Sequence, residues 1–484
     1  MKRKMPVFAS ALALTMALTA CSGTSGNAGT KETSSPAPGS SAPAATAAAS
    51  AAKDTITALL PPVSPNYQKN FDQMAKDFNA LYPNLTLKIE PAGWEDVKQK
   101  LDTQVNAGSP PDIAFGGSDS IPKYIQQGLL MDISDTVTPE MVSDYDKAPL
   151  EYMKNGKGLY GFPAYMEVHA LGGNKPFLEK AGIDWKKVQQ NGWTYEEFRE
   201  AIKKGVVTEN GKTRYGFVFA VKGVAAVDYL GIMAKNAGMP HAFNKDLKYA
   251  YTSKNYLGLL KDLRQLIDDG SMPKELSSVD AGKRWNMFLT GQTMITGKGI
   301  AVFENSGKNN NKKLEAKDAS AVKDSIPVDY VVLPAPTFQG AKASSATVVD
   351  GYLTFRGKKE PTPEHKANVI KAAYFLASGK VAATTNNDLF AAHITQSAKK
   401  EAANMKIDRN PDNIAAVDNM LKNATPARSD IPTELAAKAI KLETEVIVPK
   451  FQGLLAGEVT PEAMYEAVKT AAIAAFGADG VVKD

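Results

Sequence analysis

The stretch from Asp54 to Leu129 alternates between short strand patterns and amphipathic helix patterns, and this alternation restricts the fold more than any other feature. The strand patterns are DTITALL at 54–60, LTLKIE at 85–90 and the segment 112–115, and each precedes residues at helical spacing. In the first helix the predicted core face comprises Phe71, Met74, Ala75, Phe78 and Leu81. Strands that alternate with helices form a largely parallel sheet, so the sequence predicts an α/β fold.

Two polar loops in this region mark the expected ligand edge of the sheet. Asn66 follows the first strand and Asp119 follows the third. Ligands of open α/β sheets bind beyond the carboxyl ends of the strands. We therefore expect Asn66 and Asp119 to lie at a ligand site.

An extended stretch between turn residues runs from Gly158 to Lys175. Residues two apart in a strand share a face, so Tyr165, Glu167 and His169 are predicted to point the same way. An aromatic ring, an acid and an imidazole on one face suit a cleft for a polar ligand. A half-exposed strand whose polar side meets water fits the same pattern, and the stretch alone does not separate the two.

The region after this stretch combines helices with a few strands. Thr194 to Glu197 form a capping box, flanked by Trp193 and Phe198 at the spacing of a hydrophobic staple. Residues 306–325 are rich in Asn and Lys and poor in apolar side chains, which predicts an exposed excursion. Residues 347–355 read as a strand that contains Asp350, and the remainder of the chain is predominantly helical.

The N-terminus carries the signs of export. Basic residues at positions 2–4 precede an apolar run from Phe8 to Leu18, which is too short for a permanent membrane span. Cys21 is the sole cysteine, so no disulfide can form within the chain. We predict a signal peptide at 1–20 and a disordered Ser-, Gly-, Thr-, Ala- and Pro-rich tether at 21–53. An incidental free thiol after the signal is the alternative for Cys21.

The balance of charges in the composition argues against nucleic acid as a partner. Without the three basic residues of the signal, 54 basic residues face 52 acidic ones. This near balance gives no electrostatic basis for binding nucleic acid.

Enzyme motifs are scarce. Gly291 to Gly299 has the wrong spacing for a phosphate loop, and Gly299 stands where a magnesium-binding Ser or Thr belongs. The four histidines are scattered, and no metal or cofactor motif is present. We expect neither a metal nor a cofactor nor a catalytic residue. A secreted glycan-degrading enzyme remains an alternative, because a pair of catalytic carboxylates leaves no fixed sequence spacing.

Aromatic and acidic side chains near the expected ligand edge would suit a sugar. The C–H face of a sugar stacks on aromatic rings, while carboxylates bind its hydroxyls. The candidate ligand-binding residues are Asn66, Trp94, Asp119, Tyr165, Glu167, His169, Trp285, Asp350 and Tyr352. For Trp94 and Trp285, core packing is the alternative and the more common role of a tryptophan.

Several of these segments together resemble a known family. Residues 111–115, the loop to Asp119 and residues 124–130 are similar to the third strand, ligand loop and following helix of bacterial extracellular solute-binding lipoproteins of ABC importers. The stretch from Tyr160 to Lys175 resembles the first crossing between the lobes of these proteins. Residues 288–294, 332–334 and 453–467 resemble further elements in the same order. The resemblance is to the carbohydrate-binding branch, which includes maltodextrin- and multiple-sugar-binding proteins.

The resemblance implies a two-lobed periplasmic-binding-protein-like fold with hinge strands and a ligand cleft between the lobes. The expected N-terminal lobe is 54–164 plus 337–378, and the C-terminal lobe is 165–336 plus 379–484. Crossings are implied near 164–168, 331–336 and 377–385. In this family the sole cysteine after the signal is diacylated, and two acyl chains suffice for anchoring.

The implied function is capture of a carbohydrate by hinge closure and its delivery to transmembrane permease subunits of an ABC transporter. The protein would be a monomer, lipid-anchored through Cys21 at the extracellular face of the cell membrane. Gly116 stands where maltodextrin binders carry a stacking tryptophan, and the helix after Pro432 lacks an expected aromatic residue. Another oligosaccharide or a glycoside fragment therefore fits better. A peptide, polyamine or other polar solute on the same fold is the alternative.

Overall fold

A parallel three-stranded unit begins the part of the chain that the structure describes. The computed structural model describes residues 52–64, 66–93, 96–222 and 225–483. The first elements are β1 Asp54–Leu60, α1 Tyr67–Leu81, β2 Leu85–Pro91, α2 Val97–Ala107, β3 Ile113–Gly117 and α3 Ile121–Gln126. β1 pairs in parallel with both β2 and β3. The predicted α/β unit is therefore confirmed.

The core face of α1 is confirmed except at its last residue. Phe71, Met74 and Phe78 are buried, whereas Leu81 is 63% exposed. The ring of Tyr82, just after the helix, packs against Phe78 with a centroid distance of 5.1 Å. Tyr82 thus covers the end of this face, and the prediction for Leu81 is wrong.

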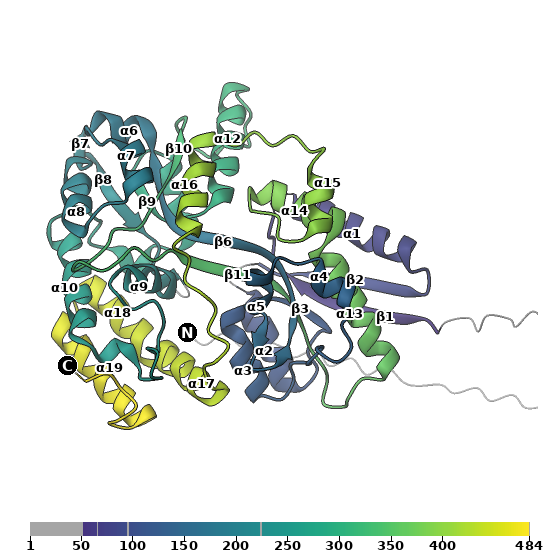
Figure 1. Ribbon diagram of the computed structural model, residues 1–484. Helices are drawn as coiled ribbons and strands as arrows, with labels where there is room; N and C mark the ends of the chain where they lie inside the picture. The colour runs from purple at the N-terminus through teal and green to yellow at the C-terminus, as the bar shows by residue number, and fades with distance from the viewer. Residues whose placement is uncertain (1–51, 65, 94–95, 223–224, 484) are drawn as a thin grey trace, which may run out of the picture. The chain divides into compact units, whose positions relative to one another are not determined.

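Two long antiparallel strands connect this unit to the rest of the sheet. They are β6 Gly161–Asn174 and β11 Ala346–Thr354, which lie side by side in Figure 1. β11 also pairs with β3, and the far half of β6 pairs with β9 Thr293–Gly299 and β10 Tyr330–Leu333. The sheet order is β2-β1-β3-β11-β6-β9-β8-β7, with β10 on β6.

β6 passes from one hydrophobic core to another. Its residue Tyr165 packs in the core of β1–β3, and Leu171 packs in a second core with β8 and α10. β6 thus leaves the first core after Tyr165 and reaches the second at Leu171, next to the crossing that the resemblance implies near 164–168. The second crossing is made by β11, since β10 stays with the second core.

The elements of the second core follow β6 along the chain. They are α6 Lys175–Lys180, α7 Trp185–Asn191, α8 Tyr195–Lys204, β7 Val207–Glu209, β8 Lys212–Phe219, α9 Ala225–Asn236, α10 Lys254–Asp268, α11 Ala281–Leu289 and α12 Ala301–Glu315. The capping box at Thr194 and Glu197 is confirmed, and the rings of Trp193 and Phe198 meet edge-on at 5.1 Å.

Residues 306–325 are largely exposed, as predicted, but their first half is helical because it belongs to α12. The Asn311 side chain donates to the Val328 carbonyl at 2.8 Å and accepts from the Val328 N–H at 3.0 Å. Asn310 Oδ1 accepts from the Val322 N–H at 2.9 Å. The asparagines that gave this stretch its loop-like composition therefore hold the following segment against the helix.

The last part of the chain returns to both cores. Its helices are α13 Pro363–Ala377, α14 Gly379–Leu389, α15 Gln396–Ala402, α16 Pro411–Leu421, α17 Thr433–Leu442, α18 Val448–Ala456 and α19 Pro461–Phe476, with a π-helical turn, η4, at Glu443–Ile447. Shorter elements are α4 Pro139–Ser143, α5 Lys147–Glu151, β4 Lys154–Asn155 and β5 Gly158–Leu159.

The two cores divide the chain at positions other than the expected lobe limits. Phe338 packs in the second core, although 337–378 was expected in the N-terminal lobe. Val381, Leu389 and Ile394 pack in the first core, although 379–484 was expected in the C-terminal lobe. The reason for the latter difference is that only Ser378 separates α13 from α14, so α14 stays with its neighbour rather than crossing.

The expected signal peptide and Cys21 lie outside the described residues. Within the described residues, no helix combines the length and the apolar character that a membrane span requires.

Candidate functional site

Acidic side chains converge where β3, β6 and β11 meet. A methyl group on Gly117 of β3 would lie 2.5 Å from Asp119 Oδ1 and 2.9 Å from Asp350 Oδ1, so both carboxylates flank the same backbone atom. The pairing of β11 with β6 sets Asp350 opposite Tyr165, whose hydroxyl donates to Asp350 Oδ2 at 3.4 Å.

Glu167 and His169 continue this cluster along β6. The Glu167 carboxylate accepts a hydrogen bond from the Ala301 N–H at the start of α12. His169 is buried, and its Nε2 lies 3.3 Å from Lys298 Nζ on β9. Lys298 Nζ in turn lies 3.0 Å from Asp228 Oδ2 on α9. The structure thus brings together Asp119, Tyr165, Glu167, His169 and Asp350, and adds Asp228 and Lys298.

Three of the carboxyl groups hold protons more tightly than usual. Burial, with the nearby charge of Asp350, raises the pKa of Glu167 to about 7 against the pull of Lys298. Burial and Asp119 raise the pKa of Asp350 to about 7. Desolvation by the walls of the cleft and repulsion by Asp228 also raise the pKa of Asp119, against the pull of Lys98, although the Asp119 residue is exposed. Carboxyl groups with too few cationic partners characterise functional sites.

Lys298 supplies the main positive charge of the cluster. Burial alone would raise the pKa of Asp228, but the charge and hydrogen bond of Lys298, with the charge of Arg284, hold it below its ordinary value. Burial and Lys298 lower the pKa of His169 to about 3, so its imidazole is neutral. His169 therefore acts as a hydrogen-bonding group and carries no charge at neutral pH.

Sequence reasoning missed Asp228 and Lys298. Lys298 lies in the glycine-rich segment that resembles a phosphate loop and fails its spacing. Asp228 stands among the apolar residues of α9. An acid in a helix whose other side chains are mostly buried is the sequence signal that could have identified it as a site residue.

A cavity of about 990 Å³ opens beside Asp119, and we call it the cleft. Its polar side includes Lys98, Asn106 and Glu443, and its apolar side is formed by Tyr251 and residues of α17. Burial and the charge of Asp119 raise the pKa of Glu443 to about 7. This volume is in the range that holds an oligosaccharide-sized ligand.

The other sequence candidates lie elsewhere. Asn66 is exposed and donates to Asp388 Oδ2 at 3.2 Å. Tyr352 is 2% exposed, because it packs edge-on against Phe115 in the first core. Trp285 is half-buried and stacks on Phe303 with a centroid distance of 4.5 Å. Trp94 lies outside the described residues. None of the three described side chains lines the cleft, and Asp119 is the one described candidate that does; Tyr165, Glu167, His169 and Asp350 form the acidic cluster next to Asp119.

Metal chemistry finds no support in this arrangement. In the described parts of the chain, no group of three or more His, Cys, Asp or Glu side chains is placed to hold a metal ion.

Comparison with known proteins agrees with this architecture. Residues 63–383 match the family model of the bacterial extracellular solute-binding proteins. The chain belongs to this family. Solute-binding proteins capture a ligand rather than transform it, and the family thereby accounts for the scarcity of enzyme motifs.

Curated relatives are similar in sequence to part of this solute-binding protein. A lipoprotein of Streptomyces antibioticus is 26% identical over 152 residues, which is 31% of this chain and 32% of the relative. A binding protein of Brucella abortus is 27% identical over 228 residues, or 47% of this chain and 54% of the relative. The chain thus spans about a third to a half of the length of the curated relatives it matches.

Solved structures share the fold over nearly the whole chain. An ABC substrate-binding protein of Listeria monocytogenes in complex with cycloalternan has a TM-score of 0.66 at 20% identity, covering 89% of this chain and 100% of that one. A solute-binding protein of Thermotoga lettingae bound with α-D-tagatose has a TM-score of 0.68 at 20% identity, covering 87% and 99%. At this identity the likeness shows the two-lobed fold.

Proposed function

We propose that this solute-binding protein captures a carbohydrate in the cleft and delivers it to the permease subunits of an ABC importer. An oligosaccharide or a glycoside fragment is the proposed ligand class. The family and the saccharides bound by structurally similar proteins support this proposal. The cluster of Asp119, Glu167 and Asp350 beside the cleft is the observation that carries it.

These carboxyl groups suit sugar hydroxyls for a chemical reason. A hydroxyl group both donates and accepts, so it is best matched by partners that do both. Glu167 and Asp350, with pKa values of about 7, are protonated in part of the population at neutral pH and can then donate as well as accept. The neutral imidazole of His169 and the Tyr165 hydroxyl offer further polar atoms of this kind.

Ligand capture would involve bending of the chain between the two cores. β6 and β11 are the paired strands that pass from one core to the other, so they are the proposed hinge. We assign the two lobes to the two cores. The proposed site residues are Asp119, Glu167 and Asp350, with Tyr165 and His169 beside them.

Membrane attachment is proposed to occur through Cys21. The sequence pattern around this residue and the name of the Streptomyces relative support a lipid anchor on the extracellular side. Replacing Cys21 by Ser should release the protein into the medium. Intact-mass measurement of the membrane fraction would reveal the acyl chains on the wild-type protein.

A second candidate ligand class is a cationic solute, such as an amino sugar or a polyamine. The favouring observation is a small excess of acidic over basic groups: Asp119, Glu167, Asp228 and Asp350 face Lys98, Arg284 and Lys298. A bound ammonium group would balance this charge and lower the raised pKa values. The neutral sugar remains the leading class, because partly protonated carboxyl groups serve it without a counter-charge.

Isothermal titration calorimetry with neutral oligosaccharides, amino sugars, polyamines and peptides would separate the classes. We expect Asp119→Ala and Glu167→Ala to weaken binding by about 10- to 150-fold, the loss of one hydrogen bond to a charged group. The exposed acid Glu200 on α8 provides a control, and Glu200→Ala should bind like the wild type. Unchanged affinity in both cleft variants would reject the proposed site, and release of reducing ends from a glycan would indicate an enzyme.

A further inference from the structure

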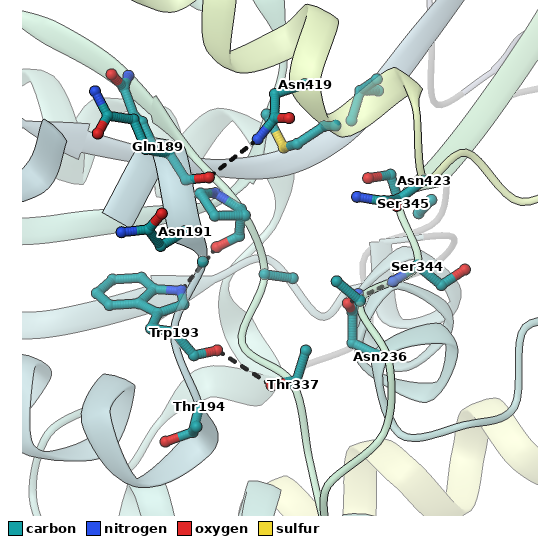
Figure 2. A pocket seen from close by; sticks show the side chains of 18 of the residues that line it. Gln189, Asn191, Trp193, Thr194, Asn236, Thr337, Ser344, Ser345, Asn419 and Asn423 are labelled. Atoms are coloured by element: carbon teal, nitrogen blue, oxygen red, sulfur yellow. Dashed lines mark hydrogen bonds between the residues drawn. The ribbon is translucent and has the colours of Figure 1, made fainter. Parts of the chain in front are cut away.

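A second cavity lies away from the cleft and shares no lining residue with it. Its volume is about 490 Å³, and Figure 2 shows it from close by. Its walls come from Val168 and His169 of β6, the connection between α7 and α8, the segment before β11, and the end of α16. We call this cavity the amide pocket.

The lining of the amide pocket combines polar and apolar side chains and is almost uncharged. Six of its side chains are amides and four are hydroxyls, while Lys187 and Glu197 contribute one charge of each sign. Amides donate and accept in the same way as sugar hydroxyls. A lining without net charge offers no attraction to an anion or a cation, so it favours a neutral, polyhydroxylated ligand.

Internal hydrogen bonds hold the walls in place. Trp193 Nε1 donates to the Pro334 carbonyl at 2.9 Å, and the Thr337 N–H donates to the Trp193 carbonyl at 3.0 Å. On the facing side, Asn236 Oδ1 accepts from the Ser344 N–H at 3.2 Å. Walls fixed in this way lower the entropy cost of ordering a ligand.

Other amides remain free to bind. Within the described residues, the side chains of Gln190, Asn191 and Asn423 are exposed and engage in no hydrogen bond of their own. Figure 2 shows Asn191 beside Trp193 on one side of the pocket and Asn423 near Ser345 on the other. Fixed walls, together with free amides on opposite sides, are features of a preformed binding site.

We propose that the amide pocket is a second ligand site, which takes a neutral saccharide of one or two sugar units independently of the cleft. Volumes of this order are typical of small-molecule sites. The two cavities have no lining residue in common, but His169 of the acidic cluster also lines the amide pocket. Substitutions that leave His169 in place can therefore disable either cavity without changing the lining of the other. The inference does not depend on what the cleft binds.

Ligand-observed NMR and calorimetry on the full chain test this proposal. The probes are glucose, galactose, mannose, sucrose, trehalose and maltose. The pocket variant combines Asn191→Leu with Asn423→Leu, and the cleft variant combines Asp119→Ala with Glu167→Ala. Asn286→Leu is the matched control, because Asn286 is an exposed amide on α11 that lines neither cavity.

The proposal expects at least one probe to bind the cleft variant and the control with wild-type affinity, and the pocket variant at least tenfold more weakly. If the leucine pair fails to fold, Asn423→Ala alone should still weaken that probe. The proposal is overturned if every saturable signal disappears in the cleft variant, or if no probe binds any of the proteins. If no saccharide binds more weakly to the cleft variant than to the wild type, while one probe is still lost in the pocket variant, the proposed function fails and the amide pocket stands.

Discussion

Carboxylates gather at both ends of the parallel strands β1 and β3, and the two groups differ in how well they are paired. At the strand starts, His365 Nδ1 lies 2.9 Å from Asp54 Oδ2 and His365 Nε2 lies 3.1 Å from Asp112 Oδ1. Asn368 and Thr57 donate further hydrogen bonds to these acids. Beyond the strand ends, Asp119, Glu167 and Asp350 meet with raised pKa values.

The difference distinguishes a structural cluster from a functional one. Burial would raise the pKa of Asp54, but its bonds to Asn368 and His365 hold that pKa below its ordinary value. In the cleft, burial is not offset to the same extent. A cluster that satisfies itself stabilises the fold, whereas one that lacks partners gains most when a ligand supplies them.

Removal of Lys298, the lysine of the acidic cluster, should have the largest effect. Lys298→Met leaves Asp228 without its ion pair and removes the charge that opposes proton uptake by Glu167 and Asp350. We expect a loss of about 2–4 kcal/mol in the free energy of unfolding at pH 8, somewhat below the cost of breaking a fully buried pair because both partners are 25% exposed. Urea denaturation at pH 8 and pH 5 measures it, and the loss should be smaller at pH 5, where the acids with raised pKa values are protonated.

Lys175→Met serves as the control for this prediction. Lys175 Nζ lies 3.4 Å from Asp329 Oδ2, with side chains 34% and 51% exposed, so its loss should cost less than about 0.5 kcal/mol. Equal losses in the free energy of unfolding for the two variants would mean that the ion pair of Lys298 contributes no more to stability than an ordinary surface ion pair.

Neutralising Glu167 should change the free energy of unfolding moderately, and in the stabilising direction. Its pKa is about 7 in the folded chain against an ordinary value of 4.5, so the folded state binds the proton more tightly. Stability from this group is therefore full below pH 4.5 and declines as the pH rises to 7. We expect Glu167→Gln to be more stable than the wild type by about 1–2 kcal/mol at pH 8 and equally stable at pH 4.

Urea unfolding of both proteins at a series of pH values from 4 to 8 tests this expectation. The same variant should bind the cleft ligand more weakly, since stability and function are opposed at such a site. Parallel stability curves across the whole pH range would show that Glu167 titrates like a solvated acid.

Local patterns predicted the elements better than the limits of the cores. The strand Asp54–Leu60 and the capping box at Thr194 depend on nearby residues alone, and both are confirmed. α12 was missed because its asparagines are satisfied by Val322 and Val328, contacts that only the folded chain reveals. The lobe limits depend on which core each helix meets, as α14 shows.

The candidate site was predictable where strand periodicity applies. Tyr165, Glu167 and His169 lie two residues apart on β6, and the structure brings all three together with Asp119 and Asp350. Lys298 and Asp228 come from β9 and α9, whose positions beside β6 follow from sheet order and not from any local spacing. Tyr352 and Trp285 were chosen by residue type, and aromatic rings are as suited to cores as to ligand sites.

The smallest effect is expected at the satisfied cluster. Burial lowers the pKa of His365, but its bonds to Asp54 and Asp112 outweigh this and raise that pKa above 6.5. Its contribution to stability is therefore present below pH 6.5 and disappears as the pH rises through the folded-state value. Since the His365 side chain is 29% exposed, His365→Gln should cost only about 0.5–1 kcal/mol at pH 5.5 and nothing at pH 8.

His393 provides the matched contrast, because burial and the charges of Lys399 and Arg409 lower its pKa. The wild-type protein should therefore lose stability on acidification, as His393 has to be protonated in the folded state, and His393→Gln should remove this loss. This trend is the reverse of the one at His365. Urea midpoints at pH 5.5 and pH 8, with ligand affinity measured on the same samples, test both variants. A pH-independent loss in His365→Gln, or a change in its ligand affinity, would remove the distinction between the two carboxylate clusters.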